Sequence, residues 1–478
     1  MTTSSQGRIK IDSSILQHLL GRHNMDPDFT KKNRPELLAL CKEKGIKGYS
    51  TKKKEELIKL LIESVPPQNE IVTAPVATAP MGLSSGSSFK FIDLFCGIGG
   101  FHQALASLGG KCVLACDIDA KCREVYNKNY GLMPHEDVTK LDTATMPDFD
   151  VLCGGFPCQP FSHAGKQDGF EDTRGTLFQD IVRILRDKQP SYFLLENVKN
   201  LKGHDEGRTW ATIYNALFSA GYLTYNKLIV MSPHHFGIPQ HRERVIIMGI
   251  RKDLVGDDGK LPPLPEMTPQ DTDITSILLP DSEVPPEVHL SALDIGVLNL
   301  WEEFIQYFKG RGVKLPTFPM WSEDWDKTYS LTGLPDWKAK FVQQNRDFYT
   351  AHKAYLDGWL ARARETEGFS GARAKLEWQC GAFQTTDSLW TLIFQYRPSG
   401  IRVKRPTYSP ALVALAQIVV IGCKKRKLCP REVARLQSFP DSFQLPSRAA
   451  DAYRQFGNAV NVEVIRQGAQ HMFSMRHN

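Results

Sequence analysis

The sequence lacks several features that would assign it to other protein classes. No apolar run approaches the ~20 residues of a membrane-spanning helix. The ten cysteines form no Cys-x-x-Cys pair and no metal-ligand spacing, so we expect no metal site. The first residues, 1–6, lack the charged and apolar regions of a signal peptide. These absences predict an intracellular protein whose scattered thiols stay reduced.

The charge is almost balanced over most of the chain. The 478 residues are 41% hydrophobic and 23% charged, which is typical of a soluble globular protein of about two to four domains. The net charge is +6, and residues 1–66 contribute 13 Lys and Arg against 8 Asp and Glu. The remainder is close to neutral, so any nucleic-acid-binding surface there must be a local patch.

Strand and helix patterns alternate between residues 89 and 252. This alternation predicts a doubly wound α/β sheet. The expected strands lie near 89–95, 111–116, 149–154, 191–195, 223–231 and 244–250, and the expected helices near 100–108, 119–128, 175–187 and 208–220.

Two reactive side chains follow neighbouring apolar runs. Cys158 follows the run 149–156, and Glu196 follows the run 192–195. Ligands of open α/β sheets bind at the carboxyl ends of the strands, so this thiol and this carboxylate can face one substrate. The alternative is a buried structural thiol and a helix-capping glutamate, because free cysteines are commonly buried.

A glycine turn and an acidic residue indicate a bound nucleoside. Gly97 and Gly99 follow the first expected strand, and Asp117 ends the second, about 20 residues on, where an acid takes ribose hydroxyls. The position of a third glycine holds His102, so the dinucleotide fingerprint is incomplete. A nucleoside without a pyrophosphate therefore fits better than NAD.

Six motifs, spread over roughly residues 89 to 475, occur in the order found in one enzyme family. The chain resembles the DNA (cytosine-5)-methyltransferases. The motifs are Phe95-x-Gly97-x-Gly99-Gly100, Gly155-Phe-Pro-Cys158-Gln159, Glu196-Asn197-Val198, Gln240-x-Arg242-x-Arg244, Pro430 to Pro440, and Gln455-Phe-Gly-Asn458-Ala-Val460.

This resemblance implies a mechanism. A Rossmann-like methyltransferase domain would transfer a methyl group from S-adenosylmethionine to C5 of a cytosine that is flipped out of duplex DNA. Cys158 would add to C6, since a thiolate is strongly nucleophilic and can leave again. Glu196 would stabilise the charge at N3, and Arg242 and Arg244 would hold the base. A tRNA methyltransferase and an inactive DNA-binding protein remain alternatives.

The resemblance also implies the binding residues. Those expected around S-adenosylmethionine are Phe95, Gly97, Ile98, Gly99, Asp117 (ribose), Ile118 (adenine), Asp137, Val138, Gly155, Pro157, Leu177, Asn458 and Val460. Those expected to contact DNA are Gln159, Ser162, Gln240, Arg397, Arg402, Lys404 and Arg405.

The chain divides into five expected segments. In residues 1–66, the positions Leu38, Gly45, Ile46, Gly48, Lys53 and Leu57 resemble the pattern of SAP domains, which are helical DNA-binding modules, although a helical hairpin for protein contacts is the alternative. Residues 67–88 are a Pro-, Ala- and Ser-rich flexible linker. Residues 89–255 and 426–478 form the catalytic domain, and 256–425 form a long target-recognition domain.

Within the target-recognition region, two patterns carry expectations. Residues 337–364 have a helical rhythm, and the stripe Phe341, Phe348, Tyr355 and Trp359 indicates core packing rather than base stacking. The basic segment 397–405 is expected to be a loop that contacts phosphates and bases, or else a solvated loop.

The expected partner is double-stranded DNA, with no membrane and no metal. We expect a monomer located with DNA, in the cytoplasm or nucleoid, or in the nucleus of a eukaryote. A cognate restriction endonuclease is left open as a further partner.

Overall fold

The computed structural model describes residues 37–38, 52–54, 57, 88–157, 177–256, 259–412 and 417–476. Residue contacts divide the chain into two units, Met1–Pro80 and Met81–Asn478. In the first unit the side chains of Leu37 and Leu57 are fully buried. The rest of the expected helical module and the linker lie outside the described residues.

A seven-stranded sheet organises the second unit. Its order is β2-β1-β3-β4-β8-β5, and β6 also pairs with β8. Strands β1 to β4 are parallel, whereas β8 is antiparallel to β4, β5 and β6. The strands are β1 (Phe89–Leu94), β2 (Gly110–Cys116), β3 (Val151–Gly155), β4 (Tyr192–Val198), β5 (Tyr222–Thr224), β6 (Ile229–Met231) and β8 (Arg244–Arg251).

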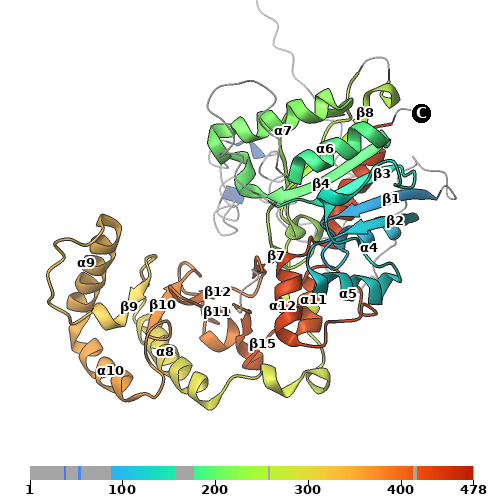
Figure 1. Ribbon diagram of the computed structural model, residues 1–478. Helices are drawn as coiled ribbons and strands as arrows, with labels where there is room; N and C mark the ends of the chain where they lie inside the picture. Colours follow the sequence, from blue (N-terminus) through green and yellow to red (C-terminus); the bar gives the residue numbers. More distant parts are fainter. Residues whose placement is uncertain are drawn as a thin grey trace, which may run out of the picture. The chain divides into compact units, whose positions relative to one another are not determined.

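Helices cover both faces of this sheet (Figure 1). One face packs on α4 and α13, where Phe473 meets the Phe89 ring at 5.0 Å. The other face packs on α6 and α7 through Ile181 and Ile213. The expected doubly wound α/β sheet is therefore confirmed. The helices are α4 (Gly100–Ala106), α5 (Ala120–Tyr130), α6 (Leu177–Lys188), α7 (Arg208–Ser219), α11 (Pro430–Leu436), α12 (Ala449–Asn458) and α13 (Val462–Phe473).

The expected strand 223–231 is wrong as a single element. It is two short strands, β5 and β6, because the chain between them leaves the sheet. Two hydrogen bonds hold this turn to other segments: the Tyr225 hydroxyl donates to the Pro262 carbonyl at 2.6 Å, and the Trp210 indole donates to the Asn226 carbonyl at 3.1 Å.

A second, six-stranded sheet lies in the expected target-recognition region, in the order β15-β14-β11-β12-β10-β9. Phe394 and Val403 on one face share a core with Trp301 and Trp359 of the neighbouring helices. The elements are β9 (Met320–Trp321), β10 (Lys375–Trp378), β11 (Ile393–Arg397), β12 (Gly400–Lys404), β14 (Val420–Ile421), β15 (Arg426–Lys427), α8 (Ala292–Gly310), α9 (Asp336–Ala351) and α10 (Lys353–Glu365).

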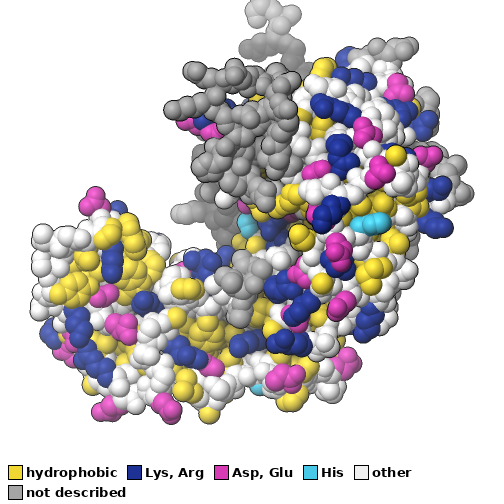
Figure 2. Space-filling view, in the orientation of Figure 1, with side chains coloured by type: hydrophobic (Ala, Val, Ile, Leu, Met, Phe, Trp, Pro, Cys, Tyr) yellow, Lys and Arg dark blue, Asp and Glu magenta, His cyan; other side chains and the backbone are white. Residues whose placement is uncertain are grey.

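The helical stretch at 337–364 is two helices, α9 and α10, which meet at His352. The aromatic stripe packs as expected: Phe348 lies 5.4 Å from Phe308, and Trp359 is fully buried. Other hydrophobic side chains gather on the surface over α9 (Figure 2). Phe348, Tyr355 and Trp359 thus belong to the core as expected, whereas Phe341 is only half-buried and contacts Trp321 and Trp337 instead.

The expected loop at 397–405 is wrong. Strands β11 and β12 form a hairpin here, in which Arg397 pairs with Gly400 across a two-residue turn. Gly400 has φ +136, and a Cβ at that position would lie 2.8 Å from the Cβ of Lys375 on β10. The close approach of β10 therefore requires glycine and makes the segment part of a sheet.

A small parallel pair connects the two sheets' regions. Strand β7 (Gln240–His241) pairs with β13 (Ser409–Pro410). Ile274 and Ile277 belong to the core of the first sheet, so the chain beyond residue 256 still packs on that sheet. Single-turn helices connect the elements: η1 (Val138–Lys140), η3 (Lys199–Lys202), η4 (His204–Gly207), η5 (Pro233–Phe236), η6 (Lys252–Leu254), η7 (Ile274–Ile277), η8 (Asp281–Glu283), η9 (Pro286–Val288), η10 (Ser322–Asp324), η11 (Leu389–Thr391) and η12 (Gly422–Lys424).

No helix within the described ranges is long and apolar enough to cross a membrane.

Candidate active site

A cleft of about 420 Å³ opens where β1 to β4 end. The turns after these strands form one wall, and the end of α12 with the two residues that follow it forms another. Side chains far apart in the sequence therefore share one space. The lining residues are Phe95, Cys96, Gly97, Gly100, Phe101, Asp117, Asp119, Cys122, Gly155, Phe156, Pro157, Glu196, Asn197, Val198, Arg242, Arg244, Gln455, Gly457, Asn458, Ala459 and Val460.

The turn after β1 is tightly supported from behind. Gly99 has φ +90, and a Cβ there would collide with the Tyr130 ring. His102, at the position where a third glycine would complete the dinucleotide fingerprint, stacks on Tyr130 at 3.8 Å and shares a 2.7 Å hydrogen bond with the Tyr126 hydroxyl. His102 thus packs behind the turn and supports it. It does not do what the third glycine of a dinucleotide fingerprint does.

Asp117 ties the first two turns together. One of its carboxylate oxygens accepts a hydrogen bond from the Gly97 N–H at 2.7 Å, and the other accepts one from the Asp119 N–H at 2.8 Å. Burial raises the pKa of Asp117. A carboxylate has about four acceptor sites, so two remain for ribose hydroxyls. The neighbouring Ile118 side chain is 82% exposed and does not line the cleft, so its expected contact with adenine stays a prediction.

Glu196 and Arg244 face each other in the cleft. The Arg244 Nε lies 3.0 Å from the Glu196 Oε1. Burial raises the pKa of Glu196, and the nearby guanidinium groups of Arg244 and Arg242 oppose that rise. A carboxyl group in this setting is able to carry a proton and donate a hydrogen bond.

Arg242 is committed to the protein backbone. Its guanidinium donates to the carbonyls of Leu412 at 2.8 Å and of Gly457 and Ala459, both at 3.0 Å. Burial lowers its pKa to about 9. These bonds hold the segment of Asn458 against the cleft. The expected contact of Arg242 with the base stays a prediction, and the bonds favour a positioning role instead.

Asn197 holds the end of β3, a function that its motif does not reveal. Its amide N–H donates to the Phe156 carbonyl at 3.1 Å, and its amide oxygen accepts from the Val198 N–H at 2.8 Å. Phe156 lies two residues before Cys158. Cys158, Gln159 and Ser162 themselves lie outside the described residues.

Other expected cofactor residues do not line the cleft. Ile98 and Val138 are buried in the two cores, and Leu177 packs against the second. The Asp137 carboxylate caps η1 by accepting from the Thr139 N–H at 3.0 Å. Gln240, expected to contact DNA, is fully buried. The roles given to these residues stay predictions.

Gln455 is a cleft residue that belongs to the last motif but has no role predicted from the sequence. Its side chain is 2% exposed, and neither amide atom has a hydrogen-bond partner among the described residues. An unpaired buried amide costs about 1–3 kcal/mol. Asp119 and Cys122 were likewise not predicted, although Asp119 is two residues from Asp117.

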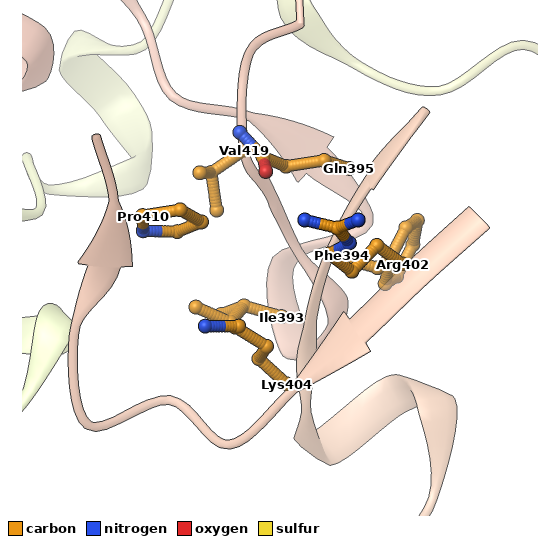
Figure 3. A pocket seen from close by; sticks show the side chains of 7 residues that line it. All are labelled: Ile393, Phe394, Gln395, Arg402, Lys404, Pro410 and Val419. Atoms are coloured by element: carbon orange, nitrogen blue, oxygen red, sulfur yellow. The ribbon is translucent and has the colours of Figure 1, made fainter. Parts of the chain in front are cut away.

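Charged side chains from the β11–β12 hairpin line a separate, smaller pocket. Arg402 and Lys404 extend from β12 into the space opposite Pro410 (Figure 3). The Arg402 Nε lies 2.6 Å from the Glu377 carboxylate. Arg405 instead forms a 2.6 Å ion pair with the buried Asp387 and also bonds two backbone carbonyls. The expected DNA contact of Arg405 therefore has no structural support.

The doubly wound sheet with its antiparallel β8, and the cleft at its strand ends closed by the C-terminal segment, define a Rossmann-like methyltransferase domain. Residues 89–474 match the family model described as C-5 cytosine-specific DNA methylase. The chain belongs to this family. It is a DNA (cytosine-5)-methyltransferase, as the six motifs predict, and the family match favours neither of the alternatives that the sequence left open.

Three curated relatives illustrate the similarity. The type II methyltransferase M.AluI of Cellulosimicrobium cellulans is 33% identical and covers 80% of this chain and 91% of its own length. M.HhaI of Haemophilus parahaemolyticus is 33% identical and covers 80% of this chain and 93% of its own length. M.HpaII of Haemophilus parainfluenzae is 36% identical and covers 79% of this chain and 87% of its own length.

Proposed function

We propose that the cleft binds S-adenosylmethionine and a flipped-out cytosine side by side. The observation that carries this proposal is that one cleft joins Asp117, at the end of β2, to the Glu196–Arg244 pair at β4 and β8. Its volume of about 420 Å³ is in the range of small-molecule sites.

The lining residues fit this cofactor. The residues proposed to hold it are Phe95, Gly97, Asp117, Gly155, Pro157, Asn458 and Val460, with Ile118 at the adenine. The unpaired amide of Gln455 adds a donor and an acceptor for the cofactor's polar groups. When bound, S-adenosylmethionine supplies an electrophilic methyl group.

The chain's own residues prepare the cytosine. The Cys158 thiolate adds to C6, and the electron pair of the C5–C6 bond makes C5 nucleophilic. Protonated Glu196 donates to N3, where charge develops, and Arg244 donates to O2. After methylation a base removes the C5 proton, the C6–S bond breaks, and Cys158 returns to the thiolate.

The test replaces the nucleophile. Cys158→Ser is expected to abolish turnover while DNA binding persists, because a hydroxyl is not ionised at neutral pH. Cys423→Ser, which changes an exposed thiol, is the matched control. Wild-type protein should also become covalently trapped on duplex DNA containing 5-fluorocytosine, since fluorine cannot leave as the proton does. Turnover by Cys158→Ser near the wild-type rate would refute the assignment.

We also propose that Arg397, Arg402 and Lys404 contact DNA, with Gln159 and Ser162 closer to the flipped base. The domains proposed are the catalytic parts 89–255 and 426–478 and the target-recognition domain 256–425. The SAP-like module 1–66 would add non-specific affinity for DNA.

Two further proposals concern partners. The relatives are named type II methyltransferases, which supports a cognate restriction endonuclease acting on the same sequence. We also propose that the enzyme acts as a monomer. We propose that it acts inside the cell, where the DNA is.

A further inference from the structure

The second sheet has one apolar face and one charged face. Side chains alternate between the faces of a strand. Phe394 and Val403 point into the core with α8 and α10, so their neighbours Arg402 and Lys404 lie on the opposite face. Lys375 pairs with Trp321 across β10 and β9, and the pairing of β10 with β12 places both on this same opposite face.

Positive charge on this face is not balanced. Glu377 pairs with Arg402, but neither Arg397 nor Lys404 has a carboxylate within ion-pair distance among the described residues. Burial lowers the pKa of both Arg397 and Lys404, and the nearby Arg402 lowers each further, while Glu377 opposes the change at Arg397. Such a cluster of cations attracts anions, and the phosphates of DNA are anions of this kind.

An aromatic ladder continues this face at the β9 edge. The Trp321 ring lies 5.7 Å from Phe341 of α9, and Phe341 lies 6.4 Å from Trp337. The Lys375 Nζ lies 5.8 Å from the Trp321 ring centre. Trp337 is 60% exposed. A tryptophan this exposed, in contact with the half-buried Phe341 ring, marks an interaction surface.

The charges around the ladder favour nucleic acid over protein. Lys338 and Lys340 are exposed on the first turns of α9, where one acid, Asp336, is also exposed. Lysine is depleted at protein–protein interfaces, whereas lysines clustered on one face are typical of nucleic-acid-binding surfaces. The two acids that follow Trp321 already accept hydrogen bonds within the protein: Glu323 from the Gly371 N–H at 3.1 Å, and Asp324 from the Tyr329 hydroxyl at 2.7 Å.

We propose that the ladder Trp321–Phe341–Trp337, together with Lys375 and Lys340, binds the sugar–phosphate backbone of duplex DNA beside the recognised sequence. This inference rests on the proposed DNA contacts of Arg397, Arg402 and Lys404. Strands lie about 4.8 Å apart, so the ladder extends on the order of 20 Å beyond β12. At about 3.4 Å per base pair, this adds about six base pairs on one side of the site.

The experiment compares two duplexes that carry the same recognised sequence. The short duplex has about three flanking base pairs on each side, and the long one about twelve, so that only the long one spans the ladder. The sequence is first obtained by methylation mapping. Dissociation constants are measured by fluorescence anisotropy, and methyl transfer is measured in parallel.

The double variant Trp337→Ala/Lys340→Ala is expected to bind the long duplex about fivefold or more weakly, with the short duplex unaffected. Lys340→Glu alone should show the same selectivity. Phe218→Ala is the matched control, because Phe218 is also an exposed aromatic residue with a lysine, Lys252, over its ring. It should leave both affinities unchanged.

Equal affinity of the variant and the wild type for the long duplex would overturn the proposal. So would a wild-type dimer, seen by sedimentation, that the double variant disrupts, since the ladder would then bind a second copy of the chain. Failure of the hairpin contacts is distinguishable: Arg402→Ala and Lys404→Ala would then leave binding of the short duplex unchanged, whereas the ladder is judged on the long duplex alone.

Discussion

The Arg244 guanidinium lies 3.0 Å from the Glu196 carboxylate, and both face the cleft beside the ends of β3 and β4. A protonated Glu196 carboxyl is a hydrogen-bond donor that can give up its proton, whereas the Arg244 guanidinium is a donor that keeps its proton. Cytosine presents N3 and O2 side by side, so this arrangement matches the edge of the base that must accept charge.

Glu196→Gln is therefore expected to lower the single-turnover rate of methylation by roughly 10²–10⁴-fold, the usual contribution of general acid catalysis. The amide can donate a hydrogen bond but cannot transfer a proton. S-adenosylmethionine affinity, measured by calorimetry, should change little.

Glu243→Gln is the matched control for this change. Glu243 lies next to Arg244 in the sequence but forms a 2.7 Å ion pair with Lys199 rather than lining the cleft. It should keep near-wild-type rates. A Glu196→Gln enzyme as fast as this control would remove Glu196 from the chemistry.

Asn197→Ala tests the support of the nucleophile loop. The substitution removes the hydrogen bond to the Phe156 carbonyl and leaves that buried group unpaired. We expect a decrease of about 1–3 kcal/mol in the free energy of unfolding, with a lower kcat and an unchanged KM for S-adenosylmethionine. Urea unfolding and steady-state kinetics measure both effects. A decrease in stability without any change in kcat would show that Asn197 is only structural.

Asp117→Ala tests the cofactor site. The variant lacks the acceptor for ribose hydroxyls and the bonds that tie the first two turns together. S-adenosylmethionine should bind about 1–3 kcal/mol more weakly in calorimetry. Asp142→Ala is the control, because Asp142 is an exposed acid that accepts from the Ala144 N–H at 3.0 Å and does not line the cleft. Unchanged affinity in Asp117→Ala would place the ribose elsewhere.

The sequence predicted the strand ends and the cleft because the motifs lie where β1, β2, β3 and β4 stop. It could not separate the roles of Arg242 and Arg244. Both belong to one motif, but Arg242 bonds carbonyls at residues 412, 457 and 459, which no local pattern reveals. Long-range partners therefore decide which of the two arginines is held by backbone carbonyls.

The target-recognition region was predicted less well for a similar reason. Pro398, Ser399 and Gly400 are typical loop residues, yet they lie in a hairpin whose second strand also pairs with β10, which is distant in the sequence. Arg405 resembled its basic neighbours, yet Asp387, 18 residues upstream, neutralises it. The spacing of apolar residues along a helix, in contrast, depends only on the local sequence. Phe348 and Trp359 of the aromatic stripe were therefore predicted correctly as core.

Asp93 gives the protein a pH-dependent stability that a single substitution should remove. Its carboxyl is fully buried, and its Oδ2 has no partner among the described residues. Burial, followed by the nearby Asp117, raises its pKa well above the ordinary value. In the unfolded chain the Asp93 carboxyl ionises above about pH 4, whereas in the folded protein it keeps its proton up to the raised pKa. The free energy of unfolding therefore falls as pH rises from about 4 to that raised pKa.

Asp93→Asn keeps the shape but cannot ionise. The melting temperature of the variant relative to wild type should therefore increase as pH rises from about 4, and level off above the folded-state pKa. Thermal unfolding followed by circular dichroism over this range measures the difference. A difference that stays constant with pH would mean that Asp93 is ionised in the folded protein.

The last prediction concerns the N-terminal 88 residues. Residues 1–66 carry a surplus of five positive charges, and a Pro-, Ala- and Ser-rich linker follows them. The module should raise the effective concentration of the enzyme near DNA by binding neighbouring phosphates, without reading bases. Deleting residues 1–88 should leave the methylated sequence unchanged and weaken DNA binding, most strongly at low salt. The slope of log K against log salt should become shallower by about 0.9 for each phosphate that the module neutralises in the full-length protein. Equal binding by both proteins at every salt concentration would point to a protein-binding module, whereas a change in the methylated sequence would show that the module reads bases.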